Sequence, residues 1–251
     1  ICVVGGAGHA GLPLSIAFAS AGQDVIIYDL NTTAMDDIRK GTMPFVEYGA
    51  EPLLKQALQE NRLTFTSDPS EVERAEHVIV AIGTPVDEYL NPKLRALLDL
   101  FGELRPHLRP SQTIVIRSTV FPGTCRHVER FLGDKEGQWK IAYCPERIAQ
   151  GFAIRELSEL PQIVSGCSPE AVESATQLFA LLAPEIIRVE IEEAELAKLF
   201  TNAWRYIQFA AANQFYMLAN NAGVDFNRIR DAMIRGYGRA ASLPKAGFAA
   251  G

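Results

Sequence analysis

Three glycines near the start of the sequence have the spacing of a loop that binds dinucleotide phosphates. The stretch VVGGAGHAG contains Gly6-x-Gly8-x-x-Gly11. In such a loop the first glycine allows a tight turn, the second lets the backbone approach a pyrophosphate, and the third lets the next helix pack closely on the sheet. The helix N-terminus, with His9 and Ala10, then offers free N–H groups to the phosphates. We expect the His9 ring to be exposed or packed rather than catalytic.

An acidic residue ends the next apolar segment, DVIIYD. Asp29 follows the last glycine by about 20 residues, the spacing of NAD-binding sites. A carboxylate there accepts hydrogen bonds from the adenosine ribose and repels a 2′-phosphate, so NAD is predicted rather than NADP. The alternative is a strand, turn and helix in which the glycines serve packing and Asp29 caps the helix in DLNTTAMDD. The glycine spacing together with Asp29 favours NAD.

Three further apolar segments are followed by hydroxyl or carboxylate groups. These groups belong to Gly83-Thr84-Pro85, Ser118-Thr119 and Pro145-Glu146-Arg147. Ligands of an open parallel sheet bind beyond the carboxyl ends of its strands, so we expect Thr84, Thr119 and Glu146 at the edge where the cofactor lies. Taken singly, each stretch could also be an ordinary turn, and Thr119 a helix cap.

A stripe of polar residues crosses the apolar segment EAELAKLFTNAWRYIQFAAAN, which has no proline or glycine and is predicted to be a helix. Spaced three, four and three positions apart, these residues are Glu195, Lys198, Asn202 and Arg205. On a helix they fall within an arc of about 80°. One interpretation is a solvated face with local ion pairs, such as Glu195 with Lys198. The other is that the stripe faces a ligand.

Short β-rich segments that alternate with helical ones must position these residues. The predicted strands are ICVV, DVIIYD, LTFT, HVIVAIG, TIVIRST, KIAYC, QIVSG and IIRVEI, and helices are predicted between them, for example over 12–21, 93–104 and 169–182. Continuous Val/Ile runs are typical of strands buried on both faces. Residues 1–190 are therefore predicted to form a doubly wound, mostly parallel, Rossmann-like α/β sheet that binds NAD.

Residues 191–251 are predicted to be helical. A helix of about thirty residues should end near Asn221, and a shorter one should begin at Asp225, which is a suitable N-cap after the glycine in NNAGVD. The long helix carries large apolar residues on several of its faces, namely Phe200, Trp204, Phe209, Phe215 and Met217. One small domain cannot cover them all, so we expect a homodimer interface here.

Composition limits the class of protein. The chain has 251 residues, of which 48% are hydrophobic, and a net charge of −6. It can bury a sizeable core, and it lacks the excess of basic residues that nucleic-acid binding requires. It has no signal peptide and no apolar run as long as a membrane span, which takes about 20 residues. The spacing of the four cysteines matches neither a zinc site nor a CxxC motif, so no metal site is predicted. We expect these cysteines to be reduced thiols in a cytoplasmic protein. Because the sequence begins inside a strand pattern and ends in LPKAGFAAG, we expect a piece of a longer protein.

The order of these motifs resembles the UDP-glucose/GDP-mannose dehydrogenases, which oxidise the primary alcohol of a nucleotide sugar to a carboxylate. The resemblance spans essentially the whole chain and rests on GAGHAG, the GTP loop, STVFPGT, CPERIAQG, LPQIVSG, ELAKLFTNAWR and LPKAGFAAG. It implies an NAD-binding domain, a central helical segment and a UDP-binding domain absent from these residues. It also implies a UDP-sugar as substrate and a homodimer built on the 193–221 helix.

The resemblance further implies that the polar stripe faces the reaction centre. Lys198 and Asn202 match the lysine and asparagine of the family, which stabilise the oxyanion that develops as hydride leaves for NAD; Lys198 could instead be the base. Thr119 and Glu146 match the threonine and glutamate that assist hydrolysis. A cysteine just past residue 251 is the expected nucleophile, which traps the aldehyde and forms a thioester in a second oxidation.

Departures from the family pattern bear on hydrolysis and on the substrate. Gln150 stands where many members have a second glutamate, so hydrolysis should depend on Glu146. Arg147 and Arg205 are more similar to the branch that acts on UDP-N-acetylhexosamines, in which Arg147 would contact an acetamido carbonyl or a phosphate; it could equally be a surface ion-pair partner. GFAAG has Ala-Ala in place of the usual Gly-Gly, which changes the nucleophile loop.

Two other functions stay open. A β-hydroxyacid dehydrogenase would also use a lysine and an asparagine on the long helix, but it removes two electrons and needs no cysteine. An NAD-binding sensor would keep the glycines and Asp29 and tolerate loss of Lys198. The number of NADH formed per substrate separates the two enzymes, and cofactor binding without turnover would mark the sensor.

Overall fold

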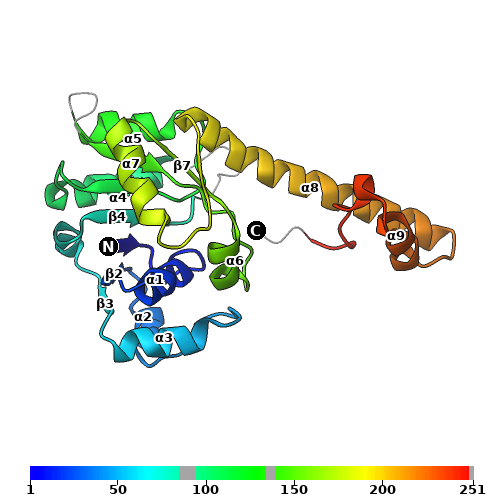
Figure 1. The fold of residues 1–251 in the computed structure, drawn as a ribbon, viewed down its shortest axis with the longest axis horizontal. Coiled ribbons are helices and arrows are strands. Elements are labelled where there is room, and N and C mark those ends of the chain that lie inside the picture. Colours follow the sequence, from blue (N-terminus) through cyan, green and yellow to red (C-terminus); the bar gives the residue numbers. More distant parts are fainter. Residues whose placement is uncertain (85–93, 134–138, 249–251) are drawn as a thin grey trace. The chain divides into compact units, whose positions relative to one another are not determined.

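The strands of the first part of the chain form one sheet. The computed structural model describes residues 1–84, 94–133 and 139–248 (Figure 1). The sheet order is β3-β2-β1-β4-β5-β6-β7-β8, and the bounds are β1 (Cys2–Val4), β2 (Val25–Tyr28), β3 (Leu63–Thr66), β4 (His77–Val80), β5 (Thr113–Ile116), β6 (Lys140–Tyr143), β7 (Gln162–Gly166) and β8 (Ile186–Arg188). β1 lies between β2 and β4, so the crevice that receives ligands in such sheets opens beyond the ends of β1 and β4.

Helices cover both faces of the sheet, because alternate residues of a buried strand point to opposite sides. Val3 and Val115 pack with α1 (Gly11–Ser20), α3 (Ala50–Gln59) and α7 (Pro169–Phe179). Cys2 and Ile114 pack on the other face with α4 (Leu94–Leu104) and α5 (Thr124–Leu132). The doubly wound α/β fold predicted from the Val/Ile runs is therefore confirmed. The remaining helices are α2 (Thr32–Arg39), α6 (Ala153–Glu159), α8 (Ile191–Asn221), α9 (Phe226–Ile234) and three short 3-10 turns, Pro69–Arg74, Arg105–His107 and Gly238–Ala240.

The last strand is shorter than the predicted IIRVEI. β8 ends at Arg188, and α8 begins at Ile191. The reason is a helix start, since the side chain of Glu193 reaches back and accepts the N–H of Glu190 at 2.9 Å, as in a capping box. The helices predicted over 12–21 and 169–182 likewise end one to three residues earlier, at Ser20 and Phe179.

One strand pair runs against the parallel pattern. β7 is antiparallel to β6, with Tyr143 opposite Ser165, whereas β1 to β6 pair in parallel. β8 follows β7 in parallel. Because β7 is reversed, its first residue, Gln162, lies at the edge where the parallel strands end. This reversal brings a residue to the ligand-binding edge that a fully parallel sheet would place at the opposite edge.

The chain divides into two compact units, Ile1–Lys198 and Leu199–Gly251. In the second unit, Phe226 of α9 packs edge-on against Tyr216 of α8, with ring centroids 6.2 Å apart. Asp225 caps α9, as predicted, by accepting the N–H of Asn227 at 2.8 Å. We propose that the domain boundary lies between residues 190 and 191, where α8 starts. Among the residues described, no helix combines the length and the apolar character needed to cross a membrane.

Candidate active site

The glycine loop between β1 and α1 has no room for side chains at two of its three motif positions. A Cβ on Gly11 would lie 2.2 Å from the carbonyl oxygen of Gly5, and a Cβ on Gly6 would lie 2.7 Å from that of Val3. The close packing predicted for Gly11 is therefore confirmed. Gly6 lies in the turn after β1, where only a glycine fits, and the residue before it, Gly5, adopts a left-handed conformation with φ +78°. Gly8 is exposed, and its Cβ would meet an atom no nearer than 3.3 Å.

The backbone after this turn presents unpaired donors. The N–H groups of His9, Ala10 and Gly11 have no acceptor among the described residues. They lie at the N-terminus of α1, where free N–H groups and the helix dipole favour an anion. The His9 ring is exposed and packs against Phe45, with ring centroids 4.1 Å apart, as expected of a residue without a catalytic role. The cradle fits the pyrophosphate of a dinucleotide.

Asp29 closes the same loop from the end of β2. One carboxylate oxygen accepts the N–H of Ala7 at 2.9 Å, and the other accepts the N–H of Asn31 at 2.9 Å. The cap of α2 is Asn31, whose side chain accepts the N–H of Ala34 at 3.0 Å. The alternative role of Asp29 as the cap of that helix is therefore wrong. The partly exposed carboxylate instead lies against the glycine loop, where a ribose is expected.

A pocket of about 360 Å³ opens beside the glycine loop at the carboxyl edge of the sheet. It is lined from the loops after β1, β4, β5 and β6, and it brings together the predicted residues Gly8, His9, Ala10, Thr84, Thr119 and Glu146. Two bonds fasten the loops after β4 and β5. The Thr84 hydroxyl donates to the carbonyl of Thr119 at 2.5 Å, and the Ser118 hydroxyl donates to that of Ile82 at 2.6 Å. Pro85, named with this loop in the sequence, lies outside the described residues.

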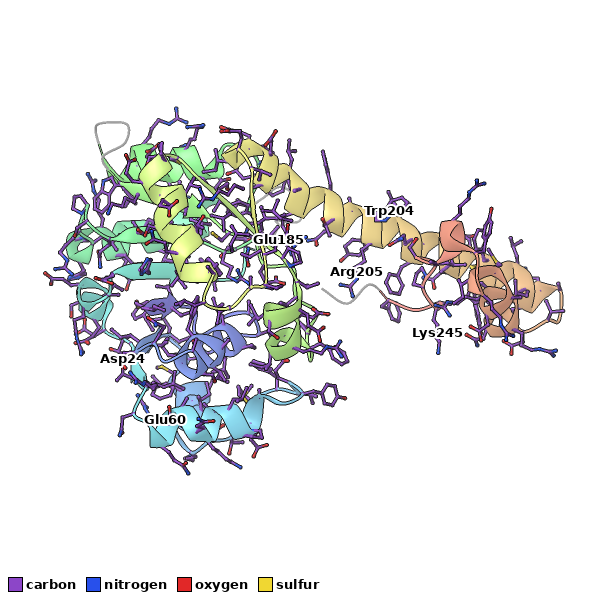
Figure 2. All side chains as sticks on the ribbon, viewed as in Figure 1. Asp24, Glu60, Glu185, Trp204, Arg205 and Lys245 are labelled. Atoms are coloured by element: carbon purple, nitrogen blue, oxygen red, sulfur yellow. The ribbon has the colours of Figure 1, made fainter. Side chains whose placement is uncertain are left out.

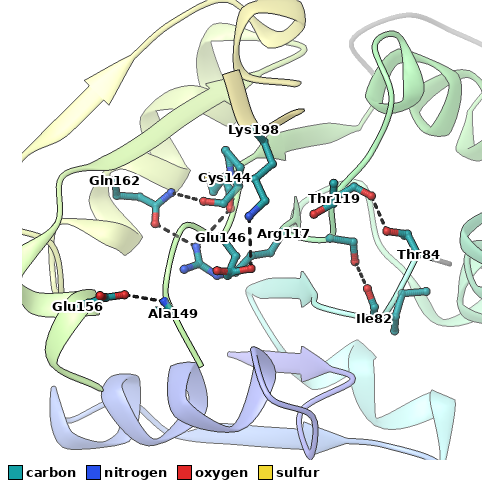
Figure 3. Close-up of polar contacts among 12 residues, drawn as sticks. Ile82, Thr84, Arg117, Thr119, Cys144, Glu146, Ala149, Glu156, Gln162 and Lys198 are labelled. Atoms are coloured by element: carbon teal, nitrogen blue, oxygen red, sulfur yellow. Dashed lines mark hydrogen bonds and ion pairs between the residues drawn. The ribbon is translucent and has the colours of Figure 1, made fainter. Parts of the chain in front are cut away.

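Lys198 and Glu146 form an ion pair next to this pocket. The Lys198 Nζ lies 3.6 Å from Oε2 of Glu146, and the two side chains are 8% and 22% exposed (Figure 3). Lys198 comes from the second turn of α8, and Glu146 from the loop after β6. Burial lowers the pKa of Lys198, while the Glu146 carboxylate acts in the opposite direction. Lys198 thus pairs across the fold with Glu146, and the alternative interpretation, a local pair with Glu195, is wrong.

The loop that carries Glu146 is fastened by two other acids. Glu156 of α6 accepts the N–H of Ala149 at 2.6 Å (Figure 3). Glu47, which is buried although it precedes α3, accepts the N–H of Gly151 at 3.1 Å. These two bonds hold the backbone of the segment that follows Glu146.

Arg147 and Gln150 belong to the same loop but differ in surroundings. The Arg147 guanidinium donates to the carbonyl of Pro161 and is partly exposed. Gln150 is exposed. The Gln150 amide cannot act as a base. Glu146 is therefore the carboxylate that this loop brings to the pocket.

Glu195 has a structural task that the spacing of the stripe did not indicate. Its side chain is fully buried and accepts the N–H groups of Gly123 at 2.6 Å and Cys125 at 2.9 Å. These groups begin α5, the helix that follows the Thr119 loop. Glu195 therefore ties the first turns of α8, which carry Lys198, to that loop.

Arg117 is a pocket residue that was not predicted from the sequence. It follows β5 directly, is buried, and lines the pocket. Its Nη1 donates to the carbonyl of Cys144 at 3.2 Å and to Oε1 of Gln162 at 3.0 Å (Figure 3). Gln162 in turn donates to the carbonyl of Pro145 at 3.2 Å. The signal in the sequence was an arginine inside the apolar strand segment TIVIRST, where a charged residue needs a reason.

Asn202 and Arg205 belong to the second unit, Leu199–Gly251, where both are half-buried. Figure 2 shows Arg205 on α8, next to the exposed Trp204. Lys198 is the last residue of the first unit. The roles of Asn202 and Arg205 in the reaction centre stay predictions.

The thiols of the chain are poor nucleophiles in this fold. Cys2, Cys125 and Cys144 are buried, and Cys167 is half-buried. Burial raises the pKa of Cys125, and the adjacent Glu195 carboxylate raises it further. The N-terminus of α5 could have lowered the pKa of Cys125, but its N–H groups already bind the Glu195 carboxylate. The terminal GFAAG segment ends in residues outside the described part of the chain.

Comparison with known proteins places both units in one family. Residues 1–183 match the sequence profile of the UDP-glucose/GDP-mannose dehydrogenase family, NAD binding domain. Residues 192–251 match the profile of the central domain of the same family. The two matches follow one another along the chain and leave only a short connection between them.

Individual relatives agree with these profiles. The chain is 33% identical over 239 residues to a GDP-mannose 6-dehydrogenase from Pseudomonas putida, and 29% identical over 233 residues to an NDP-N-acetyl-D-galactosaminuronic acid dehydrogenase from Ralstonia nicotianae. These alignments cover 91% and 88% of this chain but 55% and 54% of the relatives. The chain thus spans about half the length of the curated relatives it matches.

Solved structures show the same likeness. A UDP-D-ManNAc dehydrogenase from Pyrococcus horikoshii matches with a TM-score of 0.89 at 26% identity, covering 98% of this chain and 60% of that one. A GDP-mannose dehydrogenase from Pseudomonas aeruginosa matches with a TM-score of 0.87 at 26% identity, covering 96% and 58%.

Proposed function

The chain belongs to the UDP-glucose/GDP-mannose dehydrogenase family, and on this premise we propose that it contributes to the four-electron oxidation of a nucleotide sugar's primary alcohol to a carboxylate. The observation that carries the proposal is the Lys198–Glu146 pair beside a pocket that begins at the glycine loop. A buried lysine and a carboxylate next to a dinucleotide cradle supply a proton acceptor and an acid–base partner where hydride transfer takes place.

The cofactor is NAD, which accepts hydride when it is bound. The unpaired N–H groups of His9, Ala10 and Gly11 would hold its pyrophosphate. Asp29 would accept hydrogen bonds from the adenosine ribose. Thr84 and Thr119, which line the pocket, would orient the remaining part of the cofactor.

Lys198 is the residue that we assign to the substrate hydroxyl. Its lowered pKa raises the share of neutral amine near pH 7, which can take the hydroxyl proton. The ammonium so formed balances the negative charge on the oxygen. Asn202, four residues further along α8, would add a neutral hydrogen-bond donor.

The second half of the reaction needs a nucleophile and a water. We propose, from the family resemblance, that a cysteine past residue 251 takes up the aldehyde and that a second hydride transfer leaves a thioester. Glu146 would take a proton from the water that cleaves it, with the Thr119 hydroxyl orienting that water. One sugar alcohol and one water then yield one carboxylate, and two NAD accept the four electrons.

For the substrate we propose a UDP-N-acetylhexosamine. Arg147 supports this choice, because its guanidinium lies in the loop that carries Glu146 and can donate to an acetamido carbonyl or a phosphate. Arg205 would add a second such donor. Relatives named for GDP-mannose and for an N-acetylated sugar both match this chain, so the assay must include both kinds of substrate.

We also propose a homodimer formed through the 193–221 helix, in the cytoplasm. Phe200 and Trp204 are 65% and 58% exposed in the second unit. Large apolar side chains left in contact with water on one helix indicate an interface, and a self-complementary one is the commonest kind. Light scattering at micromolar concentration tests this: we expect a dimer mass that Trp204→Glu reduces to that of a monomer.

The test of the activity is NADH formation by the complete protein with UDP-N-acetylglucosamine, UDP-N-acetylmannosamine, UDP-glucose and GDP-mannose. Two NADH per carboxylate would support the proposal. One NADH per product would indicate a two-electron dehydrogenase, and NAD binding without NADH would indicate a sensor. Lys198→Ala should lower kcat by about 100-fold or more, whereas Lys40→Ala, which removes an exposed lysine, should leave it unchanged.

A further inference from the structure

We propose that Gln162 is a positioning residue for Glu146, because it holds the backbone directly before that glutamate at the pocket. This inference rests on the proposed function, in which Glu146 serves the hydrolysis of the thioester. In that step a water oxygen bonds to the acyl carbon, the carbon–sulfur bond breaks to release a thiolate, and Glu146 takes the proton that the water loses. Gln162 is a buried amide that the proposed reaction does not otherwise use.

The backbone directly before Glu146 leaves the sheet and is held by buried side chains. The ladder between β5 and β6 reaches Cys144, whose N–H donates to the carbonyl of the last residue of β5 at 3.0 Å. The next two carbonyls toward Glu146 accept side-chain bonds, that of Cys144 from Arg117 at 3.2 Å and that of Pro145 from Gln162 at 3.2 Å. Both residues that carry these carbonyls are buried, so the carbonyls need such partners.

Arg117 sets the orientation of the Gln162 amide. A guanidinium only donates hydrogen bonds, so it faces Oε1 of Gln162, which lies 3.0 Å from Nη1 (Figure 3). The Nε2 side of the amide then faces the carbonyls of Pro145 and Ile163, at 3.2 and 2.8 Å. The amide cannot turn over without placing its donors against those of the arginine. The bond to Pro145 is therefore fixed in direction.

This bond acts on the backbone of Glu146 itself. The carbonyl of Pro145 and the N–H of Glu146 belong to one planar peptide group, so a bond that holds the carbonyl also sets the direction in which Glu146 leaves the strand. At the other end of the residue, Oε2 of the carboxylate lies 3.6 Å from Nζ of Lys198. Gln162 and Lys198 thus hold Glu146 at its backbone and at its carboxylate, and a base must be held in this way to meet its water.

Two substitutions remove the donor to Pro145 and have opposite effects on Arg117. Gln162→Glu keeps the size of the side chain and places a carboxylate against the guanidinium, which favours the fold, but it has no N–H for the Pro145 carbonyl. Gln162→Met is of similar size and bonds to neither partner. An effect that both variants share therefore comes from the lost donor and not from the state of Arg117.

Gln112→Glu is the matched control. Gln112 is also a buried glutamine, whose amide donates to the carbonyls of Val72 and Ala75 at 2.8 and 2.6 Å and accepts the N–H of Arg109 at 2.7 Å. It directly precedes β5 and so lies at the edge of the sheet opposite the pocket. A loss of stability without an effect on Glu146 should appear in this variant.

The kinetic measurement separates oxidation from hydrolysis in the complete protein. Stopped-flow absorbance follows NADH with saturating NAD and whichever of the four assayed nucleotide sugars gives two NADH. In both Gln162 variants we expect a burst of NADH and then a steady rate about tenfold lower than in the unsubstituted protein. Mass spectrometry of acid-quenched protein should find the accumulated thioester. Gln112→Glu should keep the steady rate of the unsubstituted protein.

A crystal structure of Gln162→Glu gives a second measurement that needs no turnover, and the 3.6 Å pair of Lys198 with Glu146 should be lost in it. An intact pair would overturn the inference, and so would an unchanged rate of hydrolysis in a folded Gln162→Glu or an equal slowing in Gln112→Glu. A complete protein that forms no NADH, or one NADH per product, would refute the proposed function. The crystal structure would still decide whether Gln162 places Glu146.

Discussion

Replacing Glu195 by alanine should lower the free energy of unfolding of the first unit by about 3–5 kcal/mol. The carboxylate is fully buried and accepts two backbone N–H groups, at 2.6 and 2.9 Å, where α5 begins. Each hydrogen bond to a charged group contributes about 1.5–3 kcal/mol, and alanine leaves the buried N–H of Cys125 and the part-buried N–H of Gly123 without this acceptor. Glu195→Gln keeps the size but offers one acceptor oxygen, so its cost should be about half as large.

The measurement is urea unfolding followed by tryptophan fluorescence. Trp139 is buried in the first unit, and Trp204 is exposed in the second, so a Trp204→Phe background makes the signal report the first unit. Glu192→Ala is the control, because this residue lies on the same helix in a half-exposed pair with Arg126. Exposed pairs contribute about 0–1 kcal/mol.

Equal losses in Glu195→Ala and Glu192→Ala would refute the reasoning. That result would mean that water or another acceptor satisfies the N–H groups of Gly123 and Cys125 once the carboxylate is gone. A loss confined to Glu195→Ala, at an unchanged slope of free energy against urea, would support it.

Three further predictions concern the cofactor, the thiols and the segment as a whole. Asp29→Ala should narrow the preference for NAD over NADP by about fivefold or more, because repulsion between one carboxylate and the 2′-phosphate of NADP costs about 1 kcal/mol even in water. Calorimetric titration with both cofactors measures the two affinities, and Asp24→Ala is the control. Equal affinities for NAD and NADP in the unsubstituted protein would contradict the prediction. Burial raises to about 12 the pKa of Cys2, Cys144 and Cys167. Since a thiol far below its pKa stays protonated, Ellman's reagent at pH 8 should react with the native protein only slowly and with the denatured protein fully, and a fast native thiol would show a locally open fold. Residues 1–251 alone should bind NAD yet form no NADH with any UDP-sugar, and a carboxylate product would show that the nucleophile has been misplaced.

The sheet and the cofactor loop could be predicted because their signals are local. Runs such as HVIV and TIVI are rich in β-branched residues and do not alternate between polar and apolar residues, which is typical of strands buried on both sides. The glycine motif follows one such strand and opens a helix, and each requirement is visible within a dozen residues. The left-handed conformation of Gly5, which precedes the motif, was not predicted.

The pairings at the reaction centre could not be predicted, because they depend on contacts between distant segments. QIVSG has the short apolar pattern that also marks the parallel strands, and nothing in it indicates that β7 reverses and brings Gln162 to Arg117. Glu195 and Lys198 share a helix face, which suggests a pair on any helical wheel. In the fold each turns to a different partner, Glu195 to the start of α5 and Lys198 to Glu146.

The Glu47 contact has a consequence for the time course of folding. It joins the loop that carries Glu146 to a residue 104 positions earlier in the chain. Contacts that close such long loops form late, because the chain entropy they cost must be offset by structure already in place. A partly folded chain with its parallel strands paired would therefore still lack an ordered reaction centre. Pulsed hydrogen exchange during refolding should detect this as late protection of the Gly151 amide, after the amides of β1 and β4.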